Sequence, residues 1–90
     1  MDKIKQYKTK NNLDKALYNW VNDVVVNRFG FKGDVEDKEQ IKKFYKTKRI
    51  HTILVENTRY ETKTVSFYHK DKLKYECKID YVNLKMEVVL

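Results

Sequence analysis

The chain has 90 residues, of which 41% are hydrophobic and 37% are charged, and its formal net charge is +7. This apolar fraction, with 13% aromatic residues, excludes an intrinsically disordered chain. A single cysteine excludes an intramolecular disulfide and a cysteine-cluster zinc site, and no apolar run reaches five residues, so we expect no membrane-spanning helix.

The length predicts one domain with a modest core and roughly 5,600 Å² of exposed surface. We expect residues 12–90 to form this single compact domain. The polar, basic residues 1–11 are either a flexible tail or a short edge strand. The lone cysteine and the lack of an apolar segment behind the basic start favour a cytoplasmic location.

Lysine supplies 17 of the 20 positive charges, whereas alanine occurs once and proline is absent. Lysine, asparagine and tyrosine have A/T-rich codons, so this bias suggests an AT-rich host, such as a low-GC bacterium, or its phage or mobile element. Part of the charge then reflects codon usage. Arginine, the better bidentate ligand for phosphate, occurs only at Arg28, Arg49 and Arg59.

The first helix is predicted over about 13–28, with Asn12 as its N-cap, Asp14 in its first turn and Gly30 as its stop signal. We interpret Trp20 as a core anchor rather than a binding aromatic. The stretch 29–36 contains both glycines but matches no phosphate-binding loop. The helical pattern consists of apolar residues at three- and four-residue spacing: Leu13, Ala16, Leu17, Trp20, Val21, Val24 and Val25.

A second helix is predicted over about 38–48, because Asp37 and Gln40 form a capping box. Its start is acidic and its end is basic. The cations there either complement the helix dipole or form a phosphate-binding patch, and their density exceeds what a cap requires. These candidate binding residues are Lys42, Lys43, Lys46, Lys48 and Arg49.

Three strands are predicted next, at about 50–56, 61–69 and 73–81. Residues 50–56 are apolar at both parities, which is typical of an inner strand covered on both faces. Residues 73–81 alternate, and we expect one face to carry Leu73, Tyr75, Cys77, Ile79 and Tyr81.

The register of the hairpin formed by 61–69 and 73–81 follows from parity, because both inward sets are odd-numbered. A three-residue loop, 70–72, satisfies this condition, whereas a two-residue loop would place apolar residues opposite polar ones. The resulting pairs are Phe67 with Tyr75, Val65 with Cys77, Tyr68 with Lys74, Ser66 with Glu76, and Thr64 with Lys78.

After Tyr81 the apolar residues become even-numbered. A tight turn at 82–83 would pair Tyr81 with Leu84 and Ile79 with Met86 and create a fourth strand. A bulge in one long strand is the alternative, and we favour the fourth strand. The predicted fold is therefore α+β, with two N-terminal helices followed by a three- to four-stranded antiparallel meander and packed on its odd-numbered face.

The outer face of the central hairpin is the second candidate surface, because tyrosine among lysines can stack on bases and neutralise phosphates. Thr62, Thr64 and Ser66 lie between these residues, and Glu76 and Asp80 weaken the patch. An ordinary solvated sheet face explains the same pattern. The candidate residues are Tyr68, Lys70, Lys72, Lys74 and Lys78.

We identify no catalytic residues, metal ligands or cofactor. Cys77 is expected to point inward, where a thiol is inert, and Ser66 and His69 are expected on opposite faces of their strand. His51 and His69 lack a third ligand nearby. These features make an enzyme the less favoured class.

The sequence therefore predicts a small basic nucleic-acid-binding module. The first alternative is a regulator or inhibitor that binds an acidic protein surface, for example through a strand edge. If residues 3–8 form a strand, the element order is also similar to that of RelE-type ribonuclease toxins, although the arginine-rich inner strand usual in that family is missing. Partner identity and oligomeric state remain open at this level.

Overall fold

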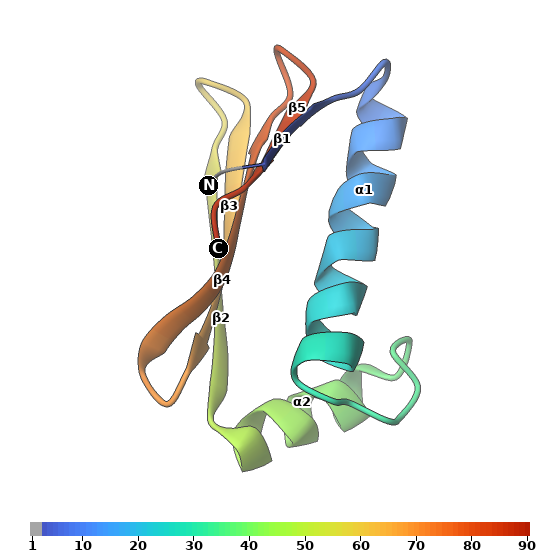
Figure 1. Ribbon diagram of the computed structural model, residues 1–90, viewed down its shortest axis with the longest axis vertical. Helices are drawn as coiled ribbons and strands as arrows, with labels where there is room; N and C mark the ends of the chain where they lie inside the picture. The colour runs from blue at the N-terminus through green and yellow to red at the C-terminus, as the bar shows by residue number, and fades with distance from the viewer. Residues whose placement is uncertain (1–2) are drawn as a thin grey trace.

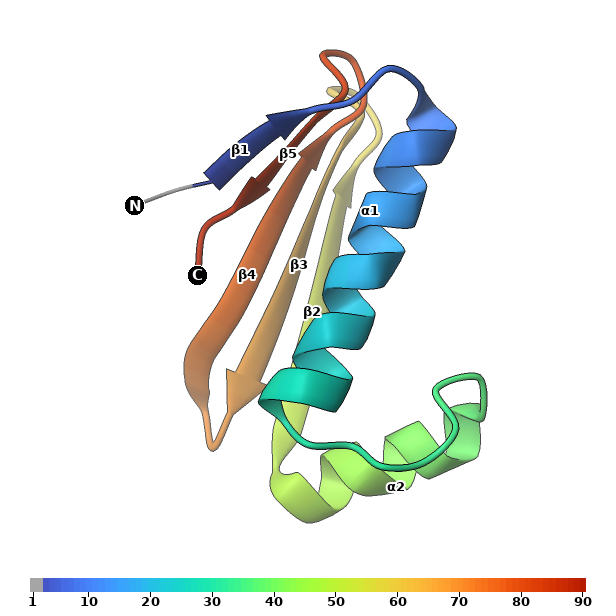
Figure 2. The ribbon, with the colours of Figure 1, turned by 45° about the vertical axis from the view of Figure 1, so that its right-hand side comes forward.

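The computed structural model describes residues 3–90 as one antiparallel sheet with two helices on the same side of it (Figures 1 and 2). The spatial order of the strands is β1-β5-β4-β3-β2. In chain order the elements are β1 (Lys3–Gln6), α1 (Lys10–Asn22), the π-helical segment η1 (Asp23–Arg28), α2 (Lys38–Lys48), β2 (Ile50–Asn57), β3 (Thr62–His69), β4 (Lys72–Asp80) and β5 (Lys85–Val88).

The predicted α+β class with an antiparallel sheet is confirmed, but the predicted order and strand count are wrong. A strand, β1, precedes the helices, and the sheet has five strands. Strand β1 pairs with β5, so residues from both ends of the described chain close the same edge. Residues 1–2, which the prediction for 1–11 included, lie outside the described residues. No helix within 3–90 is long and apolar enough to cross a membrane.

Helix α1 begins earlier than predicted, because Thr9 and not Asn12 is its N-cap. The Thr9 hydroxyl accepts a hydrogen bond from the Asn12 backbone N–H at 3.1 Å. Asp14 consequently lies beyond the first turn. The chain continues as η1 to Arg28, and Gly30 follows with a positive φ of 81°. The glycine therefore ends this segment as predicted.

Helix α2 has the predicted bounds. Asp37 accepts hydrogen bonds from the backbone N–H groups of Glu39 and Gln40, at 3.1 and 3.3 Å, and from the Gln40 side chain at 3.0 Å. Arg49 caps the other end in the left-handed conformation, with φ 60°. This residue turns the chain directly into β2.

Strand β2 is an edge strand, and the prediction that it is covered on both faces is wrong. It pairs with β3 on one side only within residues 3–90. Ile50 is buried, but every residue from 51 to 57 is exposed. The apolar side chains at odd and even positions of β2 are therefore exposed to solvent instead of being covered on both faces of the sheet.

The β3–β4 hairpin keeps the predicted register in its body but not at its tip. Phe67 pairs with Tyr75, whereas Tyr68 pairs with Leu73, so Lys74 is an unpaired bulge residue. The loop is the two-residue turn Lys70–Asp71, in which both residues have positive φ, 52° and 66°. A two-residue loop alone would pair odd-numbered residues of β3 with even-numbered residues of β4. The bulge shifts the register by one residue, so odd-numbered residues pair with each other in the body of the hairpin.

The predicted pairs Val65 with Cys77, Ser66 with Glu76, and Thr64 with Lys78 are confirmed. The pairing of Tyr68 with Lys74 is wrong. Because of the bulge, Leu73 shares the outer face with Tyr68 instead of facing the helices.

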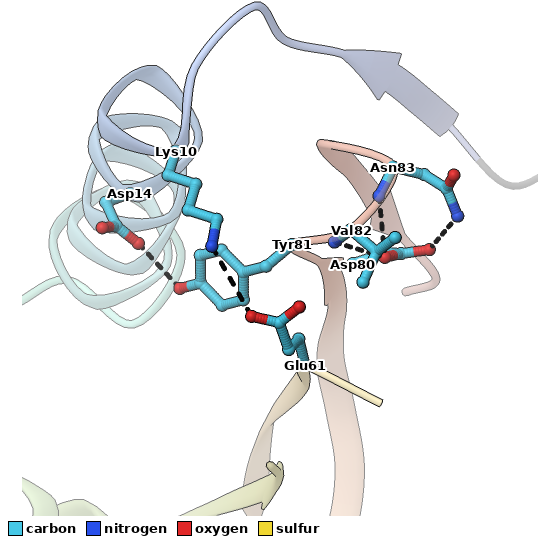
Figure 3. A network of polar contacts seen from close by, with 7 residues as sticks. All are labelled: Lys10, Asp14, Glu61, Asp80, Tyr81, Val82 and Asn83. Carbon is cyan, nitrogen blue, oxygen red and sulfur yellow. Dashed lines mark hydrogen bonds and ion pairs between the residues drawn. The ribbon is translucent and has the colours of Figure 1, made fainter. Parts of the chain in front are cut away.

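Strand β5 confirms the predicted fourth strand of the meander, with Ile79 paired to Met86. The connection is a four-residue loop, 81–84, rather than a tight turn at 82–83. Asp80 stabilises this loop by accepting hydrogen bonds from the Val82 N–H, the Asn83 N–H and the Asn83 side chain, at 2.9, 3.1 and 2.8 Å (Figure 3). The Asn83 side-chain bond is the largest cause of the lowered Asp80 pKa.

Tyr81 links α1 to this end of the sheet through a hydrogen bond. Its hydroxyl donates to the Asp14 carboxylate at 2.7 Å, and Lys10 forms an ion pair of 3.5 Å with Glu61 beside it (Figure 3). Burial, followed by the bond to Asp14, raises the pKa of Tyr81. The side chain of Tyr81 therefore points toward the helices, as predicted.

The core fills the space between the helices and the odd-numbered face of β3 and β4. One cluster gathers around Phe67 and the other around Cys77 and Ile79, and Trp20 packs against both, as expected of a core anchor. The opposite face of the sheet carries no helix in either view (Figures 1 and 2). This open face helps explain an accessible surface of 6797 Å², larger than the mass predicts.

Candidate functional site

The end of the first predicted group of cations lies beside the tip of the hairpin that carries the second group. The tip of the β3–β4 hairpin lies against the end of α2, where the Lys70 backbone N–H donates to the Arg49 carbonyl at 3.0 Å. The two groups are more than twenty residues apart in the sequence. Tertiary folding therefore brings one lysine of each group, Lys48 and Lys74, to the same place on the surface.

A pocket of about 330 Å³ lies at this surface, and we call it the basic pocket. Each of three elements contributes one permanent cation to its lining. Within residues 3–90 the lining includes no acidic side chain. It consists of Arg28, Phe29, Lys48, His69, Lys74 and Tyr75.

The cations of the basic pocket occupy defined positions in the backbone. Arg28 is the last residue of η1, Lys48 is the last residue of α2, and Lys74 is the bulge residue of β4. Lys48 in the last turn partly offsets the negative end of the α2 dipole, about half a charge. Arg28 occupies the same place in the last turn of η1, whereas Lys74 ends no helix, so at least the charge of Lys74 remains available for a ligand.

Aromatic rings form the wall between these cations. The Phe29 ring contacts the rings of Tyr75 and His69 at centroid distances of 5.4 and 5.8 Å, and the Arg28 guanidinium lies 5.6 Å from the centre of the Tyr75 ring. Asp23 is 3.8 Å from Arg28, but both side chains are about half exposed, so this ion pair is weak. The Arg28 donors are therefore available to an anion.

The remaining predicted residues do not line the basic pocket. Lys42, Lys43, Lys46 and Arg49 belong to α2 or its cap, and the first three point to solvent. The expected patch of Tyr68, Lys70, Lys72, Lys74 and Lys78 on the outer sheet face is not formed as a unit. Lys70 is in the turn, and Lys72 pairs with His69 on the helix side. Tyr68 and Lys78 stay on the outer face, where Ser66 donates to Glu76 at 3.0 Å.

Sequence reasoning missed Arg28, His69 and Tyr75 as members of the site. Arg28 was noted only as one of three arginines. The inward assignment of Tyr75 is confirmed, because its ring packs against the core cluster around Phe67, and the part of it that lines the pocket was not expected. The glycine that ends η1 gives the position of Arg28 along the chain, but no sequence signal places that end beside the hairpin. The basic pocket therefore depends on packing between elements.

A second and larger cleft, about 660 Å³, lies between β1 and α1. Its rim carries Lys3, Lys5 and Lys15, and Trp20 and Met86 contribute apolar surface. These lysines are not among the predicted binding residues. The cleft is a second basic hollow with two aromatic residues, Tyr7 and Trp20, but its cations lie on an edge strand and the exposed side of one helix.

The cysteine and the two histidines lie where the strand pairing places them. Burial raises the pKa of the Cys77 thiol to about 12, which keeps it protonated. His51 lies beside Tyr68 on the outer side, whereas His69 contacts Phe29 on the helix side. Across residues 3–90, no three His, Cys, Asp or Glu side chains come close enough to hold a metal ion.

Comparison with known proteins adds no relative. No family model matches the chain, and searches of curated proteins and of solved structures likewise find no match.

Proposed function

We propose that this protein is a small, basic, non-enzymatic module that binds single-stranded nucleic acid at the basic pocket. The observation that supports this most is the convergence of Arg28, Lys48 and Lys74, from three separate elements, on one pocket with aromatic walls. Cations supply most of the sequence-independent affinity for a phosphate backbone, and aromatic faces stack on bases.

The size of the basic pocket favours a single strand over a duplex. A volume of about 330 Å³ suits one unstacked base with its phosphate, and is too small for a helix of paired bases. In a duplex the base faces are stacked inside and inaccessible to Phe29 or Tyr75. A flexible strand can present one base to these rings while its flanking phosphates contact the cations.

The proposed ligand contacts assign a role to each side chain. Arg28, held over the Tyr75 ring, offers a planar guanidinium that can bind a phosphate through two donors. Lys48 and Lys74 act as point charges on the flanking phosphates. Three phosphate contacts predict that log K falls with log salt with a slope of about −2 for a single strand.

The test is fluorescence anisotropy of labelled single-stranded RNA, single-stranded DNA and duplex DNA over a salt range. The site variant combines Arg28→Gln, Lys48→Gln and Lys74→Gln. The matched control combines Lys32→Gln, Lys38→Gln and Lys85→Gln, which remove the same charge at exposed positions outside the basic pocket. Circular dichroism of both variants checks that they remain folded.

We expect the wild-type protein to bind single strands more tightly than duplex, with affinity falling steeply with salt. The site variant should bind about tenfold or more weakly and lose most of the salt slope, and the control variant should lose less. The absence of binding at low salt refutes the proposal. Equal losses in the two variants would show that net charge, and not the basic pocket, binds the strand.

Two observations favour a second candidate, a ribonuclease of RelE-like organisation. The strand Lys3–Gln6 precedes the two helices, as that resemblance requires, although four strands and not three follow them, and His69 lines the basic pocket. Histidine is the most common general acid–base residue in enzymes. Incubating the protein with the same RNA distinguishes the two candidates, because cleavage that His69→Gln abolishes would assign catalysis to the basic pocket.

A further inference from the structure

The two edges of the sheet differ in how they are protected from pairing with another strand. Natural edge strands are kept short or carry lysine, proline or a bulge. Strand β1 has four residues and contains Lys3 and Lys5. Strand β2 has eight residues, IHTILVEN, with no lysine, arginine or proline, and the bulge of this sheet lies between β3 and β4. The β2 edge is therefore unprotected in a chain otherwise rich in lysine.

The β2 edge is also apolar at its centre. Three consecutive residues, Ile53, Leu54 and Val55, have relative exposures of 45%, 56% and 57%. Their pairing partners in β3 place Ile53 and Val55 on the outer face and Leu54 on the helix face. Apolar surface is therefore exposed on both faces of the same edge, where a further strand would cover it.

The hydrogen bonds of β3 show which backbone groups of β2 point outward. The Lys70 N–H donates to the Arg49 carbonyl, so odd-numbered residues of β2 bond toward β3. The bond from the Tyr81 N–H to the Glu61 carbonyl agrees with this assignment. It shows that the backbone groups of odd-numbered residues of β3 bond to β4, so those of even-numbered residues bond to β2. Thr52, Leu54 and Glu56 consequently direct their N–H and C=O groups away from the sheet.

We propose that β2 pairs antiparallel with β2 of a second copy of this chain, about a twofold axis at Leu54. The outward backbone N–H and C=O groups belong to even-numbered residues, so each hydrogen-bonded pair joins two even-numbered residues. The residue numbers of every pair between the two copies therefore add to an even number. With the axis at Leu54, this residue faces its own copy, Ile53 faces Val55 of the second copy, and Thr52 faces Glu56. All three exposed apolar residues then meet apolar partners.

An axis at Ile53 also satisfies the backbone but matches the side chains less well. It would place Val55 opposite His51 and Leu54 opposite Thr52. The Leu54 axis brings no like charges opposite each other, because Glu56 is the one acidic residue of β2 and the strand contains no lysine or arginine. Side-chain complementarity therefore selects the Leu54 axis and a continuous ten-stranded sheet.

No residue of β2 lines the basic pocket, so the proposed pairing does not use the side chains that are proposed to bind nucleic acid. Two copies with a charge of +7 each repel one another, whereas the interface itself is apolar. Added salt screens that repulsion and should strengthen the dimer. Salt has the opposite effect on nucleic-acid binding, so dimerisation and the proposed function are tested separately.

The first test is analytical ultracentrifugation of the full chain over a concentration series at low and moderate salt. A strand-edge interface is small, so we expect a dissociation constant on the order of 10 µM. Leu54→Lys should weaken the dimer at least about tenfold, because it places two positive charges opposite each other. Tyr60→Lys is the matched control, since Tyr60 is 60% exposed and lies outside β2.

The second test reports the register. Leu54→Cys should form a disulfide-linked dimer under mild oxidation, because a hydrogen-bonded antiparallel pair has a Cα separation of about 5.5 Å, within disulfide range. Ile53→Cys should not form this disulfide, because residue 53 of one copy faces residue 55 of the second copy, and the two introduced cysteines lie two positions apart. Cys77 is fully buried, so the wild-type protein serves as the unreactive control.

A wild-type chain that remains monomeric throughout the concentration series overturns the proposal and leaves the β2 edge to a strand of another protein. Equal dissociation by Leu54→Lys and Tyr60→Lys overturns it as well. Efficient cross-linking through Ile53→Cys, but not Leu54→Cys, overturns the Leu54 axis. Circular dichroism of each variant establishes that a loss of dimer is not a loss of fold.

Discussion

Deletion of Lys74 tests the account of the β3–β4 hairpin. Phe67 pairs with Tyr75 and Tyr68 pairs with Leu73, so Lys74 has no partner in the ladder. Joining Leu73 directly to Tyr75 preserves both pairs and leaves a regular ladder closed by the two-residue turn. We therefore expect the deletion variant to fold with the same register.

The expected magnitude follows from burial. Lys74 is exposed, and its removal creates no cavity, so the free energy of unfolding should change by less than about 1 kcal/mol. Deletion of Lys78 is the contrasting control, because it shifts the ladder by one residue and moves Ile79, which is 1% exposed, out of the core. Loss of that side chain alone costs about 2–5 kcal/mol.

Urea unfolding followed by far-ultraviolet circular dichroism measures both variants. A chain of this length has a stability of roughly 5–13 kcal/mol, so the Lys78 deletion should remove much of it or prevent folding. The Lys74 deletion should also reduce the salt slope of nucleic-acid binding by about 0.7. Destabilisation by the Lys74 deletion as severe as that by the Lys78 deletion would refute the assignment of a bulge.

Three further outcomes follow from the structure. Lys70→Asn with Asp71→Gly should raise the free energy of unfolding by about 1–2 kcal/mol, because both residues have positive φ, and an unchanged melting temperature would contradict this. Cys77 should react with a thiol reagent at pH 8 only as fast as the protein opens, since burial raises its pKa to about 12, and rapid labelling of the folded protein would count against that burial. Asp80→Ala should destabilise the protein by about 1 kcal/mol at neutral pH. The folded-state pKa of Asp80 is lowered, so its contribution to stability is complete above its unfolded pKa of about 4 and is lost as pH falls through the folded value. The difference in the free energy of unfolding between wild type and Asp80→Ala, measured in urea, should therefore narrow in acid. A constant difference would contradict the assigned role.

Local signals in the sequence predicted several elements correctly. Helix α2 has the predicted bounds because Asp37 and Gln40 form its cap through contacts within four residues. The body of the β3–β4 hairpin has the predicted register because alternation in two neighbouring strands leaves one parity that buries Phe67 and Cys77 together. These features depend on neighbours in the chain or on one adjacent strand.

Other features could not be predicted because their local signals were ambiguous. Thr9 and Asn12 are both good N-caps, and the structure uses Thr9, which lengthens α1 by one turn. Apolar residues at both parities of β2 are typical of an inner strand, but that pattern does not determine the place of a strand in the sheet. A loop with a bulge and a three-residue loop give the same parity beyond the bulge, so Lys74 could not be identified.

The α+β class, the inward parity of the meander and the basic character of the chain follow from the order of the residues, because periodicity and charge can be read along the chain. The pairing of β1 with β5, which leaves β2 at the opposite edge with Leu54 exposed, depends on how the elements pack together. The same holds for the pocket that Arg28, Lys48 and Lys74 share. Both outcomes depend on which elements become neighbours, and that choice is made by burial of the whole apolar surface rather than by any segment alone.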